Sequence, residues 1–205
     1  MSSTAYPVGY RGKNPRVPPL ATLARNGAAL GGLGWYARAH DELARYAVEV
    51  GEPAQRVADV LALTSPRQNV ARNVGLTRQY IETSSTAGML PSVVAGLTHY
   101  ESTGEIRGPK TAAFSRALMG ENAVVIDVWM FRAMRLTHKT MTAKRYREAV
   151  AKVRRCARYV RMSPADTQSC VWCGIRTLYG YKTAGDLRFF GGESGKTDGA
   201  GFGSA

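Results

Sequence analysis

Residues 101–131 read ESTGEIRGPKTAAFSRALMGENAVVIDVWMF. The glycine-containing connection 104–108 predicts a tight turn after one helix, and Pro109 is typical of the first turn of the next. The β-branched run 123–126 predicts a short extended segment, and we expect helix again from Asp127 onward. Two helices joined by a tight turn, with a lysine in the first turn of the second helix, therefore lie in the middle of the chain.

Helical patterns continue on both sides of this stretch. Between residues 35 and 50, apolar residues recur at the spacing of one buried helix face. The Ser-Pro pairs at 65–66 and 163–164 each predict an N-cap followed by proline in the first helical turn. Because strand-like alternation is almost absent, the sequence predicts an all-α fold of about eight helices. We place them at 35–50, 53–63, 66–82, 91–103, 109–119, from 127 onward, 143–161 and 164–179.

Composition predicts three regions. We expect residues 1–22 to be a flexible basic arm, because this proline-rich segment buries little apolar surface. Residues 23–181 are expected to form one helical domain, and residues 182–205 a tail rich in glycine and serine. The chain has no apolar run of about 20 residues and no apolar signal segment at its start, so we expect a cytoplasmic protein without a membrane partner.

The three cysteines are Cys156, Cys170 and Cys173, an odd number that argues against a disulfide framework. Cys170 and Cys173 form a Cys-x-x-Cys pair, which supplies only two of the four ligands of a structural zinc site. We expect buried thiols, with a metal or redox role for the pair as the alternative. The histidines show no metal or triad spacing and no phosphate-binding glycine loop is present, so we expect neither metal nor cofactor.

Positive charge is concentrated in two places. The formal net charge is +13, and residues 132–161 contain eleven lysines and arginines against one acid, Glu148. Residues 1–30 contain four basic residues and no acid. A solvated face accounts for any single basic helix, but this concentration favours a polyanion, and nucleic acid ahead of an acidic membrane because no amphipathic anchor accompanies it. We expect phosphate contacts from Arg154, Arg155 and Arg158.

Lys110 and Asp127 are the candidate reactive pair. A lysine in the first turn of a helix lies near the positive helix end, which disfavours its protonated form. An amine with a lowered pKa can attack a sugar carbon and form a Schiff base. An aspartate that follows a buried run can remain ionised and stabilise a cationic sugar. The alternative is a surface lysine and an aspartate that only caps a helix.

Four segments stand out in chain order: Ser65-Pro-Arg-Gln-Asn-Val-Ala-Arg, Gly108-Pro-Lys-Thr-Ala, Ile126-Asp-Val-Trp-Met and Gln168-Ser-Cys-Val-Trp. In the same order, they resemble segments of the helix-hairpin-helix DNA glycosylases, most closely of the 8-oxoguanine glycosylase branch. The resemblance implies a two-lobed helical fold in which Lys110 attacks the sugar and Asp127 supports departure of the base. It implies a base pocket lined by Phe114, Gln168 and Trp172. It also implies that the gap left by the flipped base is filled by Arg67, Gln68 and Asn69.

The chain departs from the family's pattern at two positions. The family's hairpin carries Pro-Gly-x-Gly before the lysine, whereas Ile106 takes the place of the first glycine here. Trp129 stands where the family has a histidine that contacts phosphate. The resemblance places Arg107, Gly108 and Trp129 against DNA. It includes no four-cysteine set for the iron–sulfur cluster that some members carry.

These patterns together predict a base-flipping DNA N-glycosylase, with AP lyase activity as a further step. We expect a monomer that acts on double-stranded DNA in a bacterial or phage-infected cell. Small phage proteins associated with thymine-derived bases carry similar patterns, so a DNA-base hypermodification enzyme on the same fold is one alternative. A DNA-binding protein without the reaction is the other.

Overall fold

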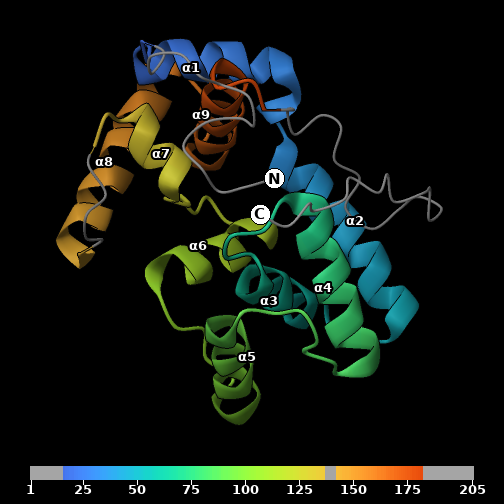
Figure 1. Cartoon of the computed structure of the whole chain (residues 1–205). Coiled ribbons are helices and arrows are strands. Elements are labelled where there is room, and N and C mark those ends of the chain that lie inside the picture. Colours follow the sequence, from blue (N-terminus) through green and yellow to red (C-terminus); the bar gives the residue numbers. More distant parts are fainter. Residues whose placement is uncertain (1–15, 137–141, 182–205) are drawn as a thin grey trace, which may run out of the picture.

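The computed structural model describes residues 16–136 and 142–181, and every regular element in these residues is a helix (Figure 1). The prediction of an all-α fold is therefore confirmed. The predicted tail and most of the predicted arm lie outside the described residues. The helices are α1 (Leu20–Gly27), α2 (Trp35–Val50), α3 (Ala54–Thr64), α4 (Val70–Thr83), α5 (Pro91–Thr103), α6 (Pro109–Leu118), α7 (Val128–Ala133), α8 (Ala143–Val160) and α9 (Pro164–Leu178), with a distorted turn η1 (Ala28–Gly32) after α1.

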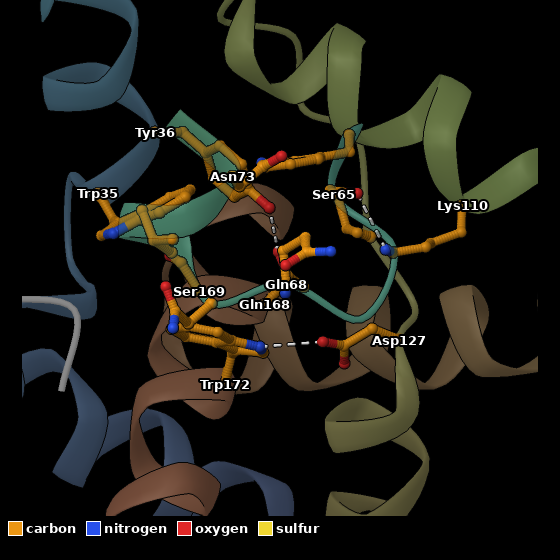
Figure 2. Close-up of a pocket in the computed structure, with 14 residues that line it drawn as sticks. Trp35, Tyr36, Ser65, Gln68, Asn73, Lys110, Asp127, Gln168, Ser169 and Trp172 are labelled. Carbon is orange, nitrogen blue, oxygen red and sulfur yellow. Dashed lines mark hydrogen bonds between the residues drawn. The ribbon is translucent and has the colours of Figure 1, made fainter. Parts of the chain in front are cut away.

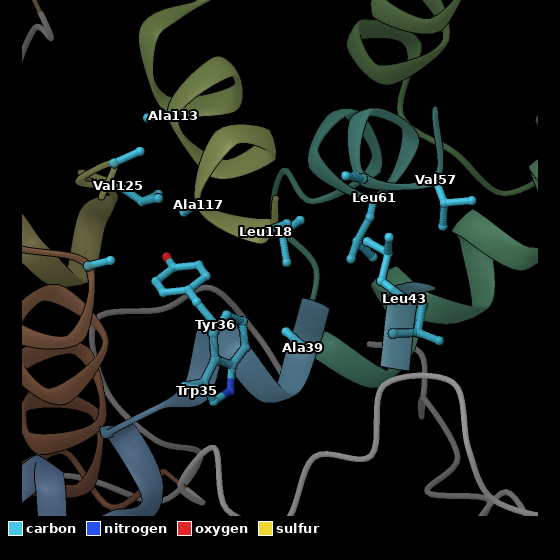
Figure 3. Close-up of a cluster of buried hydrophobic side chains, with 14 of the residues drawn as sticks. Trp35, Tyr36, Ala39, Leu43, Val57, Leu61, Ala113, Ala117, Leu118 and Val125 are labelled. Carbon is cyan, nitrogen blue, oxygen red and sulfur yellow. The ribbon is translucent and has the colours of Figure 1, made fainter. Parts of the chain in front are cut away.

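The buried side chains divide the helices into two main groups. Helices α2, α3 and α6 enclose one cluster, which includes Leu43 and Leu118 (Figure 3). Helices α1, α7, α8 and α9 enclose a second cluster, which includes Ile126 and Phe131. A smaller third cluster lies between α3, α4 and α5. Trp172 of α9 packs against both main clusters, so this side chain lies where the two groups meet.

The buried run 123–126 connects the two groups and explains why this stretch is β-branched. Ala123 and Val125 pack in the cluster of α2, α3 and α6. Val124 and Ile126 pack in the cluster of α1, α7, α8 and α9. Successive side chains of an extended segment point to opposite sides, so the run contributes alternately to both cores. Its end places Asp127 at the boundary between them.

One predicted helix start is wrong. The Ser-Pro pair at 65–66 does not open a helix, because Ser65 still belongs to the end of α3, where its hydroxyl donates to the carbonyl of Ala62 (2.8 Å). Helix α4 begins at Val70, and its N-cap is Asn69, whose side chain accepts from the backbone N–H of Arg72 (2.8 Å). Asparagine is as good an N-cap as serine, and residues 65–69 consequently form a loop.

Helix α1 had not been predicted and spans the 22/23 boundary between the predicted arm and domain. It crosses α9 at very short range. A Cβ atom added at Gly27 would overlap the backbone carbonyl of Cys170, and one added at Gly174 would overlap the backbone carbonyl of Leu23. Glycine at both crossing positions therefore lets the two backbones approach each other more closely than any larger residue would allow.

We expect Gly174→Ala to lower the free energy of unfolding by roughly 1–3 kcal/mol, because the added methyl group meets backbone atoms that cannot move aside without separating α1 from α9. Gly75→Ala is the matched control: its Cβ would meet nothing within 4 Å. This exposed position in α4 should be unchanged or more stable by up to about 1 kcal/mol. Urea denaturation of both variants measures the difference. Equal stabilities would contradict the close helix crossing.

The cysteines are as predicted from their number and context. Cys156, Cys170 and Cys173 are all buried free thiols. Within residues 16–136 and 142–181, no cluster of histidine, cysteine and acidic side chains could hold a metal ion. No helix in that part of the chain is long and apolar enough to span a bilayer.

Candidate active site

A cavity of about 110 Å³ opens where the two groups of helices meet (Figure 2). Its walls come from the start of α2, the 65–69 loop, α4, α6, the end of the 123–127 run and α9. Of the predicted site residues, those that line it are Gln68, Asn69, Lys110, Phe114, Asp127, Gln168 and Trp172. Those that complete the wall are Trp35, Tyr36, Ser65, Val70, Asn73, Val125 and Ser169.

Lys110 reaches this cavity from the first turn of α6, directly after Pro109. Its amine donates to the hydroxyl oxygen of Ser65 (3.2 Å). Because the Ser65 hydroxyl donates its own proton to Ala62, Ser65 can only accept from Lys110. A neutral amine held in this way keeps its lone pair free for an electrophile.

Burial lowers the pKa of Lys110 from its ordinary value, and the negative charge of Asp127 opposes this shift. The sequence had attributed a lowered pKa to the positive end of the helix. In the structure the main cause is instead the loss of water around the amine. Desolvation disfavours a charged amine, so burial shifts the equilibrium of Lys110 toward the neutral amine.

Asp127 caps a helix and also lines the cavity. One carboxylate oxygen caps α7 by accepting from the backbone N–H of Met130 (2.9 Å). The other oxygen accepts from the indole N–H of Trp172 (3.0 Å). The carboxylate is therefore held by two donors with a fixed orientation, and the same group lines the cavity. Figure 2 shows Lys110 and Asp127 on one side of the cavity, with Trp35 and Tyr36 on the other.

Aromatic rings form the opposite part of the wall. The ring centroids of Trp35 and Phe114 are 6.5 Å apart with planes inclined by 20°. Trp35 also lies 6.4 Å from Trp172, and Tyr36 lies 6.4 Å from Phe114. The aromatic part of the wall thus offers apolar ring faces against which a flat ring can stack.

The position of Trp172 is fixed from both ends. Its N–H is bound to Asp127, and the guanidinium of Arg176 lies 4.3 Å from its ring centroid. Burial lowers the pKa of Arg176, with the charge of Asp127 acting in the opposite direction. A cation over an indole face is an attractive arrangement, so Trp172 forms a rigid wall.

Gln168 lies inside the protein and not on a solvated helix face. It is only 3% exposed, and its carbonyl oxygen accepts from the hydroxyl of Tyr36 (2.6 Å). Burial raises the pKa of Tyr36 well above its ordinary value, and the charge of Asp127 adds to this effect. The phenol therefore remains protonated and is a permanent donor.

Several predicted DNA contacts lie outside the cavity. Arg67 is exposed at the tip of the 65–69 loop with a left-handed backbone (φ 60°). Arg107 and Gly108 are exposed in the turn between α5 and α6. All three residues are therefore accessible to solvent, next to the parts of the cavity wall formed by Gln68 and Lys110.

Trp129 is not part of the cavity. Its ring packs against Tyr179 and Tyr181, with centroid distances of 5.7 and 5.0 Å. The guanidinium of Arg132 lies 4.5 Å from the Trp129 ring centroid. Trp129 thus belongs to an aromatic and basic cluster beyond Asp127.

The predicted phosphate contacts on α8 are all exposed. The buried face of this helix consists of Tyr146, Ala149, Val153, Cys156 and Ala157. The solvent-facing side carries Arg154, Arg155 and Arg158. Apolar and basic residues are thus segregated on different sides of α8.

The apolar spacing between residues 35 and 50 predicts Trp35 and Tyr36 only as core residues, yet both also line the cavity. Both are buried at the first turn of α2, and helical spacing does not distinguish a core contact from a cavity wall. Two adjacent aromatic residues that carry polar atoms at the start of a helix were the one feature that could have indicated a cavity wall. Ser65, Asn73 and Ser169 carried no such signal, because small polar residues at a helix end or within a helix usually bond the nearby backbone.

Residues 20–178 match DUF7178, described as a family of unknown function. The chain belongs to this family. The matched range contains every residue that lines the cavity. No curated protein and no solved structure matches the chain. The DUF7178 region thus coincides with the helical domain that carries the cavity.

Proposed function

We propose that this DUF7178 protein is a DNA base-excision glycosylase that binds a flipped base in the cavity. One observation carries the proposal: Lys110, the fixed carboxylate of Asp127 and an aromatic wall all line the same cavity. Burial lowers the pKa of Lys110 in this cavity. Their combination with a buried amide, Gln168, matches the requirements for holding a base and attacking its sugar.

In the proposed reaction, the lone pair of the Lys110 amine forms a bond to the sugar carbon C1′. The bond between C1′ and the base breaks, and the base leaves with that electron pair. The sugar ring then opens as the bond from C1′ to its ring oxygen breaks, which leaves an imine between Lys110 and the sugar. The two amine protons end on the departing base and on the ring oxygen, so atoms and charge balance.

Asp127 would stabilise the positive charge that develops on the sugar as the base departs. Its carboxylate is already oriented by Met130 and Trp172, so no reorganisation is needed when the charge appears. Fixed groups aimed at developing charge are usually the largest single contribution to catalysis. Asp127 is half-buried, and partial burial strengthens this interaction relative to a fully solvated carboxylate.

The surfaces around the cavity fit a duplex from which a base has been extruded. Gln68 and Asn69 line the cavity while Arg67 projects from the same loop, so this loop would occupy the gap in the base stack. The exposed arginines of α8 would bind phosphates. On this proposal the α5–α6 unit corresponds to the helical hairpin of the glycosylases that the sequence resembles.

Neutralising Arg154, Arg155 and Arg158 together with glutamine should weaken duplex binding without changing preference among bases, because phosphate contacts carry no sequence information. The slope of log affinity against log salt should fall by about 1 for each phosphate that the variant no longer neutralises. Fluorescence anisotropy across a salt series measures both quantities. Affinity that does not respond to salt would contradict a nucleic-acid partner.

The proposed function is tested by mass spectrometry of the bases released from native, oxidised and phage-modified DNA. We expect one class of base to be released by the wild-type protein. A base that is changed but stays attached to DNA would instead indicate a hypermodification enzyme. Binding to DNA without either outcome would indicate a non-catalytic DNA-binding protein, and both results would overturn the glycosylase proposal.

A further inference from the structure

We propose that Tyr36 fixes the orientation of the Gln168 amide, so that the cavity selects a ring with a carbonyl oxygen facing Gln168 over a ring with an amino group there. The inference deepens the proposed function, because it names the class of base that the cavity accepts. The proposed selectivity follows from the hydrogen bonds of the cavity and does not depend on the chemistry of Lys110.

The contact between Tyr36 and Gln168 joins two side chains that are 6% and 3% exposed. The hydroxyl donates to the carbonyl oxygen of the amide at 2.6 Å. Within residues 16–136 and 142–181, this hydroxyl has no other hydrogen-bond partner. If the amide were turned over, its amino group would donate to the tyrosine oxygen and the buried hydroxyl proton would have no acceptor. Proteins avoid such unpaired buried donors, so the amide is held with its oxygen toward Tyr36.

The Tyr36 hydroxyl does not lose its proton and become only a hydrogen-bond acceptor. Burial raises its pKa well above the ordinary value, and the nearby negative charge of Asp127 raises it further. The phenol is therefore a donor throughout the physiological pH range. The amino group of Gln168 is correspondingly directed away from Tyr36.

Other polar groups in the buried part of the wall are committed within the protein. The side-chain oxygen of Asn73 accepts from the Thr64 hydroxyl (2.7 Å), and its amino group donates to the carbonyl of Leu61 (3.0 Å). The hydroxyl of Ser169 donates to the carbonyl of Gly32 (2.7 Å). These donors are thus used inside the fold. The amino group of Gln168 is the buried amide donor that remains for a ligand.

A ligand that faces Gln168 must therefore offer an acceptor. A ring carbonyl oxygen accepts from the amino group, whereas a ring amino group would bring two donors together and leave both unpaired. Sites built around a hydrogen bond reject ligands that cannot complete it much more strongly than sites that discriminate by size. This selection is independent of ring size, because it depends on the group at the edge of the ring that faces Gln168.

Two pairs of bases test this position. Uracil and cytosine share one ring size, and hypoxanthine and adenine share another. Within each pair a carbonyl oxygen replaces the exocyclic amino group, and the neighbouring ring nitrogen changes from an acceptor to an N–H donor. We would measure equilibrium binding of duplexes that carry each base at one central mismatch, which facilitates flipping. Wild-type protein should prefer the carbonyl member of each pair by about tenfold or more. Equal or tighter binding of the amino members would overturn the inference.

Tyr36→Phe should reduce the preference to about twofold or less, because the Gln168 amide is then free to turn over. Gln168→Met, which has no donor, should abolish it. Tyr159→Phe is the matched control, since Tyr159 is 70% exposed on α8, and should keep the wild-type preference. A purely structural role of Tyr36 would weaken both members of a pair equally, and an unchanged ratio in Tyr36→Phe would overturn the inference.

The same four bases, titrated free in solution by calorimetry, separate this inference from the proposed function. If no duplex binds but the free carbonyl bases bind more tightly than their amino partners, the DNA glycosylase proposal fails and the inference holds. If duplexes bind and bases are released without the carbonyl preference, the proposed function stands and the inference fails. Absence of any preference in both formats overturns the inference.

Discussion

Lys110→Gln is expected to reduce base release by about 10³-fold or more, because the glutamine amide has no lone pair that can attack a sugar carbon. Glutamine is similar in length and polarity, and the half-buried position at the first turn of α6 tolerates it. Duplex affinity should change little. The measurement is the single-turnover rate of base release at saturating protein.

The pH dependence of the wild-type rate provides an independent check on Lys110. Only the neutral amine is nucleophilic, so the rate should rise with pH as the amine loses its proton. Because burial lowers the pKa of Lys110, the rate should reach its plateau below the ordinary lysine value of 10.5. Lys144→Gln, at an exposed position of α8, is the matched control and should keep the wild-type rate and profile. A normal rate in Lys110→Gln would exclude Lys110 as the nucleophile.

Asp127→Asn should slow base release by about 10²- to 10³-fold, since the substitution removes the negative charge that faces the developing cation. The asparagine side-chain oxygen can still accept one of the two hydrogen bonds made by Asp127, from Met130 or from Trp172. Loss of the carboxylate acts mainly on the transition state, so the Kd for the duplex should stay within a few-fold of the wild-type value.

Glu148→Gln is the control for removal of a carboxylate, because Glu148 is exposed on α8. It should release the base at the wild-type rate. Thermal unfolding of Asp127→Asn must be measured in parallel, since Asp127 also caps α7. If the variant is folded and as fast as the wild type, Asp127 has no role beyond the cap.

Most of the helices could be predicted because their apolar residues follow one face and their ends carry caps. Ser163 caps α9 in the predicted way, with its hydroxyl accepting from Asp166. The same rule failed at Ser65, where Asn69 competes as an N-cap and the serine bonds back into α3. Propensity rules rank candidates for a helix end but do not decide between neighbours a few residues apart.

Helix α1 was missed for a different reason. It is short, and its packing depends on the close approach to α9, which Gly27 and Gly174 make possible. These glycines are separated by most of the chain, and neither has a local feature that indicates a helix crossing. Local patterns cannot report a contact that exists only in the tertiary fold.

The candidate site was predictable in its parts but not in its hydrogen bonds. Resemblance had grouped Lys110, Asp127 and Gln168, and the structure places all three on one cavity. The bond from Tyr36 to Gln168 spans 132 positions, and helical spacing assigned Tyr36 only to the core. The link between the Trp172 indole and Asp127 likewise depends on how α9 packs beside the buried run that precedes Asp127.

The central claim, that Lys110 attacks the sugar of a flipped base, is tested most directly by reduction of the imine with borohydride. The wild-type protein, mixed with the DNA from which it releases a base, should form a permanent protein–DNA adduct. Peptide mass spectrometry should locate this adduct on Lys110, and Lys110→Gln should form none. Base release by the wild-type protein without any trapped adduct, or with an adduct at another residue, would contradict the proposed role of Lys110.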